Sequence, residues 1–150
     1  MTADSAIRPV VRALIPRIRL TGAPPGSLTF ETGAVQLGAR VCWAARLAEF
    51  ELVEIFNVTR GIAATAHVRY GPEGEAMIAR SAAAFMQPGD ALHISAYAWV
   101  GPADLAGRTS TIVHLDEGNR VIEVREVRAR MAILDPASFP QPPSIELISM

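Results

Sequence analysis

Residues 91–100 read ALHISAYAWV, and this stretch is the strongest indication of the fold. Small and aliphatic side chains alternate there with polar and aromatic ones: Leu92, Ile94, Ala96, Ala98 and Val100 against His93, Ser95, Tyr97 and Trp99. Successive side chains on a β-strand point to opposite faces of the sheet. The alternation therefore predicts a strand with one face in a core.

Similar short segments lie on both sides of this stretch. Runs rich in Val, Ile and Leu predict strands at residues 10–20, 52–58, 109–115 and 120–127, and residues 63–70 are expected to continue as a further strand. The run LVEIFNV at 52–58 is mostly apolar and is predicted to be buried on both faces. Pro16 has no N–H for a sheet ladder, so it predicts a sheet edge or a bulge in the first run. The sequence DEGN at 116–119 predicts a hairpin turn.

One segment is predicted to be helical. Leu37, Val41, Ala44 and Ala48 recur at helical spacing, which indicates a helix over about residues 34–48. Several short strands with one or two short helices predict a mainly β domain, either a small barrel or a sandwich. The expected divisions are a lead-in over 1–12, the barrel domain over 13–134 and a proline-rich tail over 135–150.

Composition limits the possible functions. The 150 residues suit one domain, half of them are hydrophobic, and the net charge is only −1. This charge balance argues against nucleic acid as a partner. No apolar stretch is long enough for a signal core or a membrane span, so we expect a cytoplasmic protein with no membrane partner. The single Cys42 cannot form an internal disulfide and is expected to be buried.

The chain contains no lysine, and all 14 basic residues are arginine. This excludes a Schiff-base lysine and with it pyridoxal-phosphate chemistry, so a carbonyl needed for catalysis must come from elsewhere. Gly26-Ser27, in a proline-rich turn, is one candidate source. Attack of the serine hydroxyl on the preceding carbonyl, followed by elimination, gives a pyruvoyl group. The alternative is an ordinary turn.

Other reactive or aromatic side chains have simpler interpretations. His67, His93 and His114 are far apart and lack the spacing of metal ligands, so packed or surface histidines are expected and no metal site is predicted. Trp43 and Trp99 are expected to pack against other side chains and not to bind a ligand.

Several short motifs resemble bacterial aspartate 1-decarboxylase in order and spacing over about residues 13–128. They are Leu14-Ile15-Pro16-Arg17, Thr21, Ala23, Gly26-Ser27, Thr65, Ala82-Ala83-Ala84, Pro88-Gly89-Asp90 and Ala96-Tyr97-Ala98. The resemblance implies a six-stranded double-psi β-barrel that forms a homotetramer. It also implies self-cleavage between Gly26 and Ser27, a pyruvoyl cofactor derived from Ser27, and a maturation factor as a further partner.

The resemblance assigns roles to individual positions. Gly26 and Ser27 match the cleavage pair, and Thr65 matches the hydroxyl that assists the rearrangement. The substrate-binding positions depart from the family: Leu14 stands where the lysine falls, Ile62 or Ala63 where the arginine falls, Ala66 where the proton-donating tyrosine falls, and Arg80 where the pocket asparagine falls. The other candidate pocket residues are Arg17, Ala82 and Ala83, and Arg17 or Arg80 could replace the missing cations.

Three functions are compatible with these residues. The first is a pyruvoyl-dependent lyase that decarboxylates an amino acid or related substrate other than aspartate. The second is a cofactor-free enzyme with an apolar pocket at Leu14, Ile62 and Ala66, acting in a cyclisation or elimination step of specialised metabolism. The third is a non-catalytic paralogue that binds a ligand. An unpaired carboxylate is costly to bury, so the first predicts negligible turnover of L-aspartate.

Overall fold

The structure is a computed structural model that describes residues 6–22, 33–78 and 86–130. Eight strands lie within these residues: β1 (Arg8–Arg19), β2 (Ala34–Gly38), β3 (Leu52–Asn57), β4 (Ile62–Gly71), β5 (Ala76–Ile78), β6 (Ala91–Val100), β7 (Thr109–Leu115) and β8 (Val121–Arg128). Helix α1 (Ala39–Ala45) follows β2, and a short 3₁₀ turn, η2 (Pro102–Asp104), follows β6. The predicted tail over 135–150 is outside the described residues.

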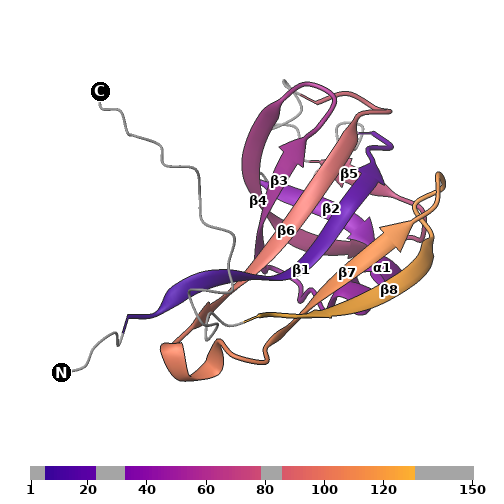
Figure 1. Ribbon diagram of the computed structural model, residues 1–150. Helices are drawn as coiled ribbons and strands as arrows, with labels where there is room; N and C mark the ends of the chain where they lie inside the picture. Colours follow the sequence, from indigo (N-terminus) through magenta and orange to yellow (C-terminus); the bar gives the residue numbers. More distant parts are fainter. Residues whose placement is uncertain (1–5, 23–32, 79–85, 131–150) are drawn as a thin grey trace, which may run out of the picture.

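The strands form one curled sheet in the order β5-β2-β4-β3-β6-β1-β7-β8 (Figure 1). The chain just after β1 closes this sheet against β5. There the Thr21 N–H donates to the Ala76 carbonyl at 2.7 Å, and Gly22 pairs with Met77. Strands β1 to β6 thus surround the core, and the β7–β8 hairpin extends the sheet beyond β1. The prediction of a mainly β, small double-psi β-barrel is confirmed.

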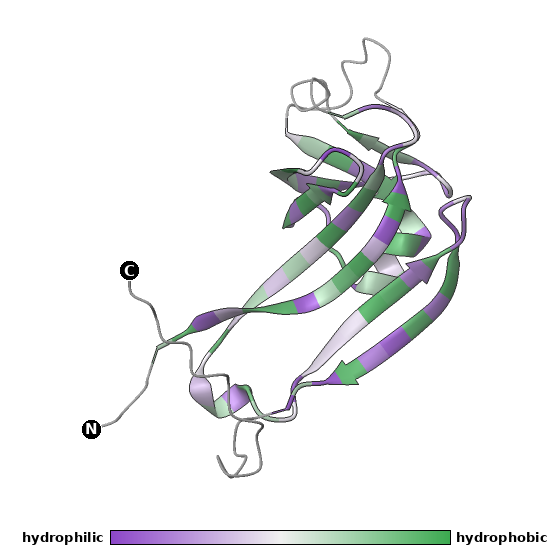
Figure 2. Cartoon of the chain, turned by 45° about the horizontal axis from the view of Figure 1, so that its top comes forward, coloured by the Kyte–Doolittle hydropathy of each residue, from purple (hydrophilic) through white to green (hydrophobic). Residues whose placement is uncertain are grey.

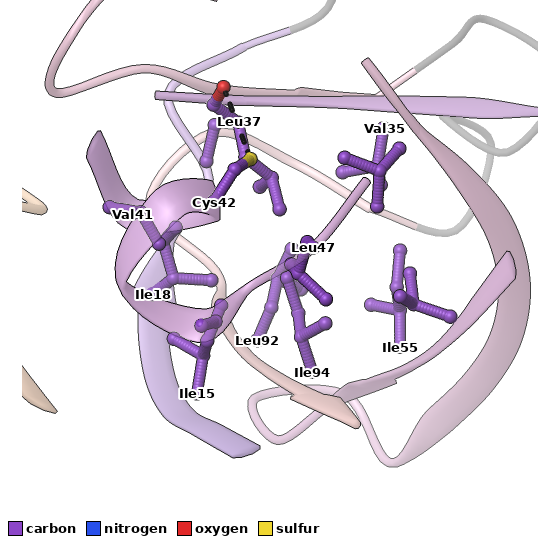
Figure 3. Close-up of a cluster of buried hydrophobic side chains, with 14 of the residues drawn as sticks. Ile15, Ile18, Val35, Leu37, Val41, Cys42, Leu47, Ile55, Leu92 and Ile94 are labelled. Carbon is purple, nitrogen blue, oxygen red and sulfur yellow. Dashed lines mark hydrogen bonds between the residues drawn. The ribbon is translucent and has the colours of Figure 1, made fainter. Parts of the chain in front are cut away.

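Aliphatic side chains fill the barrel. Figure 3 shows Ile15, Ile18, Ile55, Leu92 and Ile94 pointing into one cluster, and each is at most 1% exposed. Figure 2 shows hydrophobic and hydrophilic residues alternating along the long strands. Burying an aliphatic side chain of this size stabilises the fold by about 1.5–3 kcal/mol relative to leaving it exposed. The strand predicted over residues 91–100 is confirmed as β6, in which Leu92, Ile94, Ala96 and Val100 are buried and Tyr97 and Trp99 are exposed.

The first strand and the final hairpin also follow the sequence. In the pairing of β1 with β6, Ile15 lies opposite Ile94 but Ile18 lies opposite Leu92, so one extra residue is inserted on β1. This is the bulge predicted at Pro16. The strand begins at Arg8, within the predicted lead-in. The turn at 116–119 joins β7 to β8 as predicted.

The helix predicted over 34–48 is only partly correct. Residues 34–38 form β2, and α1 is confined to Ala39–Ala45. The apolar spacing fits a helix, but β2 pairs with β4 on one side and β5 on the other, and these two backbone ladders outweigh local preference. Gly38, with φ −52° and ψ 136°, ends the strand and begins the helix. Cys42 is buried as expected, and desolvation raises the pKa of its thiol to about 12.

Two predictions about packing are wrong. Strand β3 is not buried on both faces, because its residues alternate between buried and exposed. The tryptophans are largely exposed instead of packed against other side chains: Trp43 is 84% exposed and Trp99 is 72% exposed. Trp43 lies on the solvent side of α1, whose other side packs Val41 and Cys42 into the core. Trp99 lies on the outer face of β6. The sequence pattern predicted which residues share a face of the strand or helix. It did not predict that the outer faces of α1 and β6 carry exposed aromatic rings.

A buried carboxylate ties the chain before β6 to the end of β3. Asp90 is 4% exposed and accepts hydrogen bonds from Asn57 Nδ2 at 2.8 Å, Arg60 Nε at 2.7 Å and the Gln87 N–H at 2.9 Å. These hydrogen bonds lower the pKa of Asp90 from 3.8 to about 2, and the bond from Arg60 has the largest effect. The carboxylate thus stabilises the fold in its charged form.

We expect Asp90→Asn to lower the free energy of unfolding at neutral pH, because asparagine has no charge to pair with Arg60. The folded-state pKa is lowered, so the carboxylate's contribution is complete well above pH 3.8 and is lost as pH falls towards about 2. The stability difference between the unmodified protein and the variant should therefore shrink over that interval. Urea denaturation at descending pH measures it, and a difference independent of pH would contradict this account.

Candidate functional site

A row of cross-strand neighbours crosses the outer face of the barrel. Thr65 on β4 lies opposite Glu54 on β3, Glu54 lies opposite Ser95 on β6, and Ser95 lies opposite Leu14 on β1. Directly opposed residues share a face, with Cβ atoms about 4.5–5.5 Å apart. We call these four residues the Thr65–Leu14 row. The structure thus brings together two residues that the sequence selected, Thr65 and Leu14, although 51 positions separate them.

A tyrosine covers the middle of this row. The Tyr97 hydroxyl donates to Glu54 Oε1 at 2.8 Å. That hydrogen bond, followed by desolvation and the charge of Glu54, raises the pKa of Tyr97, while a hydrogen bond with Ser95 lowers it. Ser95 is only 6% exposed although it lies on the outer face. The row is therefore a partly covered polar site, with Glu54 and Thr65 at its exposed end.

The predicted substrate positions on β4 fall on two faces. Ala66 is 4% exposed and lies opposite Val53 in the core, so the structure separates it from Thr65 and Leu14. Ile62 has the same parity as Ala66 along the strand and also points away from the row. Ala63 is exposed and shares the outer face with Thr65. Of the two positions that correspond to the family's arginine, Ala63 is the one on the face of the row.

Several site predictions fall outside the described residues: Gly26, Ser27, Arg80, Ala82 and Ala83. Arg17 is described and lies exposed at the bulge of β1. The residues that flank the two undescribed internal segments are informative. The Ile78 N–H donates to the Gly22 carbonyl at 3.3 Å, so the last described residue before each segment lies beside the other.

Gly33, the first described residue after position 32, lies close to the row. The His67 N–H donates to the Gly33 carbonyl at 2.9 Å, and His67 follows Thr65 by two residues on the same face of β4. The resemblance assigns the self-cleavage serine to position 27 and the hydroxyl that assists it to Thr65. The placement of Gly33 near Thr65 is the observation that fits a pyruvoyl group derived from Ser27.

The histidines do not form a metal site among the described residues. The His67 ring stacks on Phe50 with centroids 5.9 Å apart, so this histidine is packed as expected. Within residues 6–22, 33–78 and 86–130, no three His, Cys, Asp or Glu side chains gather as a metal site would require. In the same part of the chain, no helix is long and apolar enough to cross a membrane.

A larger hollow lies away from the row. It is an open groove of about 860 Å³ between α1 and β8, lined by Trp43, Leu47, Tyr70, Val121 and Val124 among others. No residue of the Thr65–Leu14 row lines it. Its walls are mainly apolar, and the polar side chains that line it are Arg40, Arg46 and Tyr70.

Sequence reasoning missed Glu54. The available signal was that Glu54 is the only charged residue in the run LVEIFNV at 52–58. Because that run was interpreted as a strand buried on both faces, its single carboxylate received no role. The observed alternation places Glu54 on the outer face, opposite Thr65.

Comparison with known proteins gives a consistent family. The family model described as aspartate decarboxylase matches residues 7–122. An aspartate 1-decarboxylase of Hydrogenobaculum sp. is 33% identical over 118 residues, covering 79% of this chain and 91% of that protein. One of Methylibium petroleiphilum is 33% identical over 121 residues, covering 79% and 98%. One of Pyrobaculum islandicum is 36% identical over 95 residues, covering 63% and 77%.

Proposed function

The chain belongs to the aspartate decarboxylase family, and from this premise we propose that it is a pyruvoyl-dependent decarboxylase of an amino acid other than aspartate. One observation carries the choice of substrate. Leu14 lies in the same outer-face row as Thr65 and stands where the family has its carboxylate-binding lysine. The second cationic position, Ala63, is also without charge and lies on the same face.

Processing in this proposal begins at Ser27. Its hydroxyl attacks the carbonyl carbon of Gly26, and the Gly26–Ser27 peptide bond becomes an ester. Elimination then releases the Gly26 carboxylate, and hydrolysis consumes one water and frees one ammonia. The resulting pyruvoyl group supplies the electron-withdrawing carbonyl that a chain without lysine otherwise lacks. The Thr65 hydroxyl assists the first rearrangement from β4.

The substrate loses its α-carboxylate as carbon dioxide, and a proton takes its place on the α-carbon. The rest of the substrate meets aliphatic side chains where the family has cations. A second carboxylate would enter this partly dehydrated site unpaired, at a cost of several kcal/mol. A longer aliphatic stem gains about 0.8 kcal/mol for each buried methylene. The pocket therefore favours a side chain longer than that of aspartate and without its negative charge.

The proposal includes a homo-oligomer. Large apolar side chains are exposed on the single chain, among them Trp43 at 84%, Trp99 at 72% and Leu52 at 66%. Exposed aromatic side chains in such number are typical of protein–protein interfaces. The resemblance to the family suggests a tetramer, in which these faces would contact one another.

A panel of amino acids tests the proposed function. We expect the purified, processed protein to release carbon dioxide from at least one amino acid with a side chain longer than that of aspartate. Release from L-aspartate should be at least about a hundredfold slower, since two charge-assisted contacts are missing. Release from L-aspartate at a comparable rate would contradict the proposal. Binding of neutral ligands without any carbon dioxide release would favour the cofactor-free enzyme instead.

A further inference from the structure

Glu54 is a carboxylate whose neighbours on the same face of β3 are apolar and whose neighbours across the sheet, Thr65 and Ser95, are uncharged. Leu52 and Phe56 share its face of β3 and are 66% and 42% exposed. Glu54 Oε1 accepts a hydrogen bond from the Tyr97 hydroxyl. Within the described ranges, Glu54 Oε2 has no hydrogen-bond partner. No ion pair joins Glu54 to any described arginine or histidine. The carboxylate is thus exposed and is held by one hydrogen bond, from Tyr97.

Arg125 on β8 lies on the same line of cross-strand pairs as Glu54, so we consider whether it could neutralise the charge of Glu54. It lies opposite Ile112, which lies opposite Leu14, so four strand spacings separate it from Glu54. At about 4.8 Å per spacing the backbones are roughly 19 Å apart, beyond the reach of an arginine side chain. Arg125 instead contacts Glu123 at 3.5 Å. The charge of Glu54 is therefore not neutralised from this direction.

Tyr97 fixes the direction of the carboxylate. Its hydroxyl holds Oε1 at 2.8 Å, so Oε2 is left for a ligand. The raised pKa of Tyr97 keeps the phenol protonated and able to donate this hydrogen bond at neutral pH. The pair is consequently an oriented acceptor, and an ammonium or guanidinium group is the natural complement of such an acceptor.

We propose that Glu54 is a specificity-determining residue and that the substrate is an amino acid whose side chain ends in a positively charged group. Leu14 lacks the cation that a substrate carboxylate needs, and Glu54, next but one across the sheet, supplies an anion. The charged end of the substrate would lie at Glu54, the residue of the row that is directly opposite Thr65. This inference rests on the proposed function and names the substrate class of the same site.

Binding tests the inference without requiring catalysis. n-Pentylamine and 1-pentanol have stems of equal length, but the first ends in an ammonium and the second in an uncharged hydroxyl. Calorimetry at low ionic strength should show that n-pentylamine binds about tenfold to a hundredfold more tightly. Glu54→Gln should abolish this difference, whereas Glu123→Gln, which removes an exposed carboxylate on β8, should preserve it. Tyr97→Phe keeps the charge and should weaken the binding of n-pentylamine by less than about tenfold. Equal binding of the amine and the alcohol, or a preference that survives Glu54→Gln, overturns the inference.

Catalysis provides the second readout. L-lysine and L-norleucine differ only by the terminal amino group, so the processed protein should decarboxylate L-lysine with the higher kcat/KM. Glu54→Gln should reduce the preference for L-lysine over L-norleucine about tenfold to a hundredfold, whereas Glu123→Gln should preserve that preference. Processed protein that prefers L-norleucine would overturn the inference and leave the proposed function intact. A chain that is never processed would overturn the proposed function, and the binding comparison would still decide the role of Glu54.

Discussion

Ser27→Ala is expected to remain one chain and to release no carbon dioxide from any amino acid. Alanine has no hydroxyl to attack the Gly26 carbonyl, so the ester cannot form and no pyruvoyl group is generated. The chain contains no lysine that could provide a Schiff base instead. The loss should be complete, because the variant lacks the whole catalytic group and not one contact to it. Denaturing electrophoresis and a carbon dioxide release assay measure the two effects.

Thr29→Ala is the matched control for Ser27→Ala. It removes a hydroxyl two residues further along the same segment and should leave processing and turnover as in the unmodified protein. Thr65→Val should slow processing, because it removes the assisting hydroxyl while keeping the β-branched shape on β4. Carbon dioxide release by Ser27→Ala at the unmodified rate would show that catalysis does not depend on this serine.

The double variant Leu14→Lys/Ala63→Arg is expected to bind dicarboxylates such as succinate about tenfold to a hundredfold more tightly than the unmodified protein. Both positions lie on the outer face with Thr65, so the new cations would project to the same side of the sheet. Charge-assisted hydrogen bonds to a carboxylate contribute about 1.5–3 kcal/mol each. Adding Glu54→Gln should increase the affinity further, because it removes a carboxylate that competes for the new lysine. Calorimetry with succinate measures both steps.

Leu14→Met/Ala63→Gln controls for side-chain size without adding charge, and its affinity for succinate should stay at the unmodified level. If the charged and uncharged pairs bound succinate equally, the cationic positions would lie elsewhere. Arg17, exposed at the bulge of β1, would then be the first candidate for the carboxylate-binding group.

The parts of the fold predicted correctly are those in which local pattern and tertiary pairing agree. Strand β6 alternates over ten residues because one of its faces lies on the core. The β7–β8 hairpin has its turn residues at 116–119. Segment 34–38 could not be assigned in this way. Its apolar spacing continues into α1, and only the pairing with β4 and β5, both distant in sequence, makes it a strand.

The candidate site was only partly predictable for a related reason. Resemblance selected Thr65 and Leu14 separately, but their common face follows from cross-strand register through Glu54 and Ser95, which no local pattern encodes. The same register separates Ala66 from them, since a shift of one residue along β4 reverses the direction of the side chain. The exposed tryptophans were missed because alternation identifies two faces of a strand without saying what covers the outer one.

Intact-mass spectrometry of the unmodified protein under denaturing conditions tests the central claim most directly. The account predicts two fragments, residues 1–26 ending in a free carboxylate and residues 27–150 lighter by one ammonia than simple hydrolysis would leave. Ser27→Ala should give one full-length mass under the same conditions. A single full-length mass for the unmodified protein, after prolonged incubation at elevated temperature and after co-expression with host maturation factors, would contradict the account.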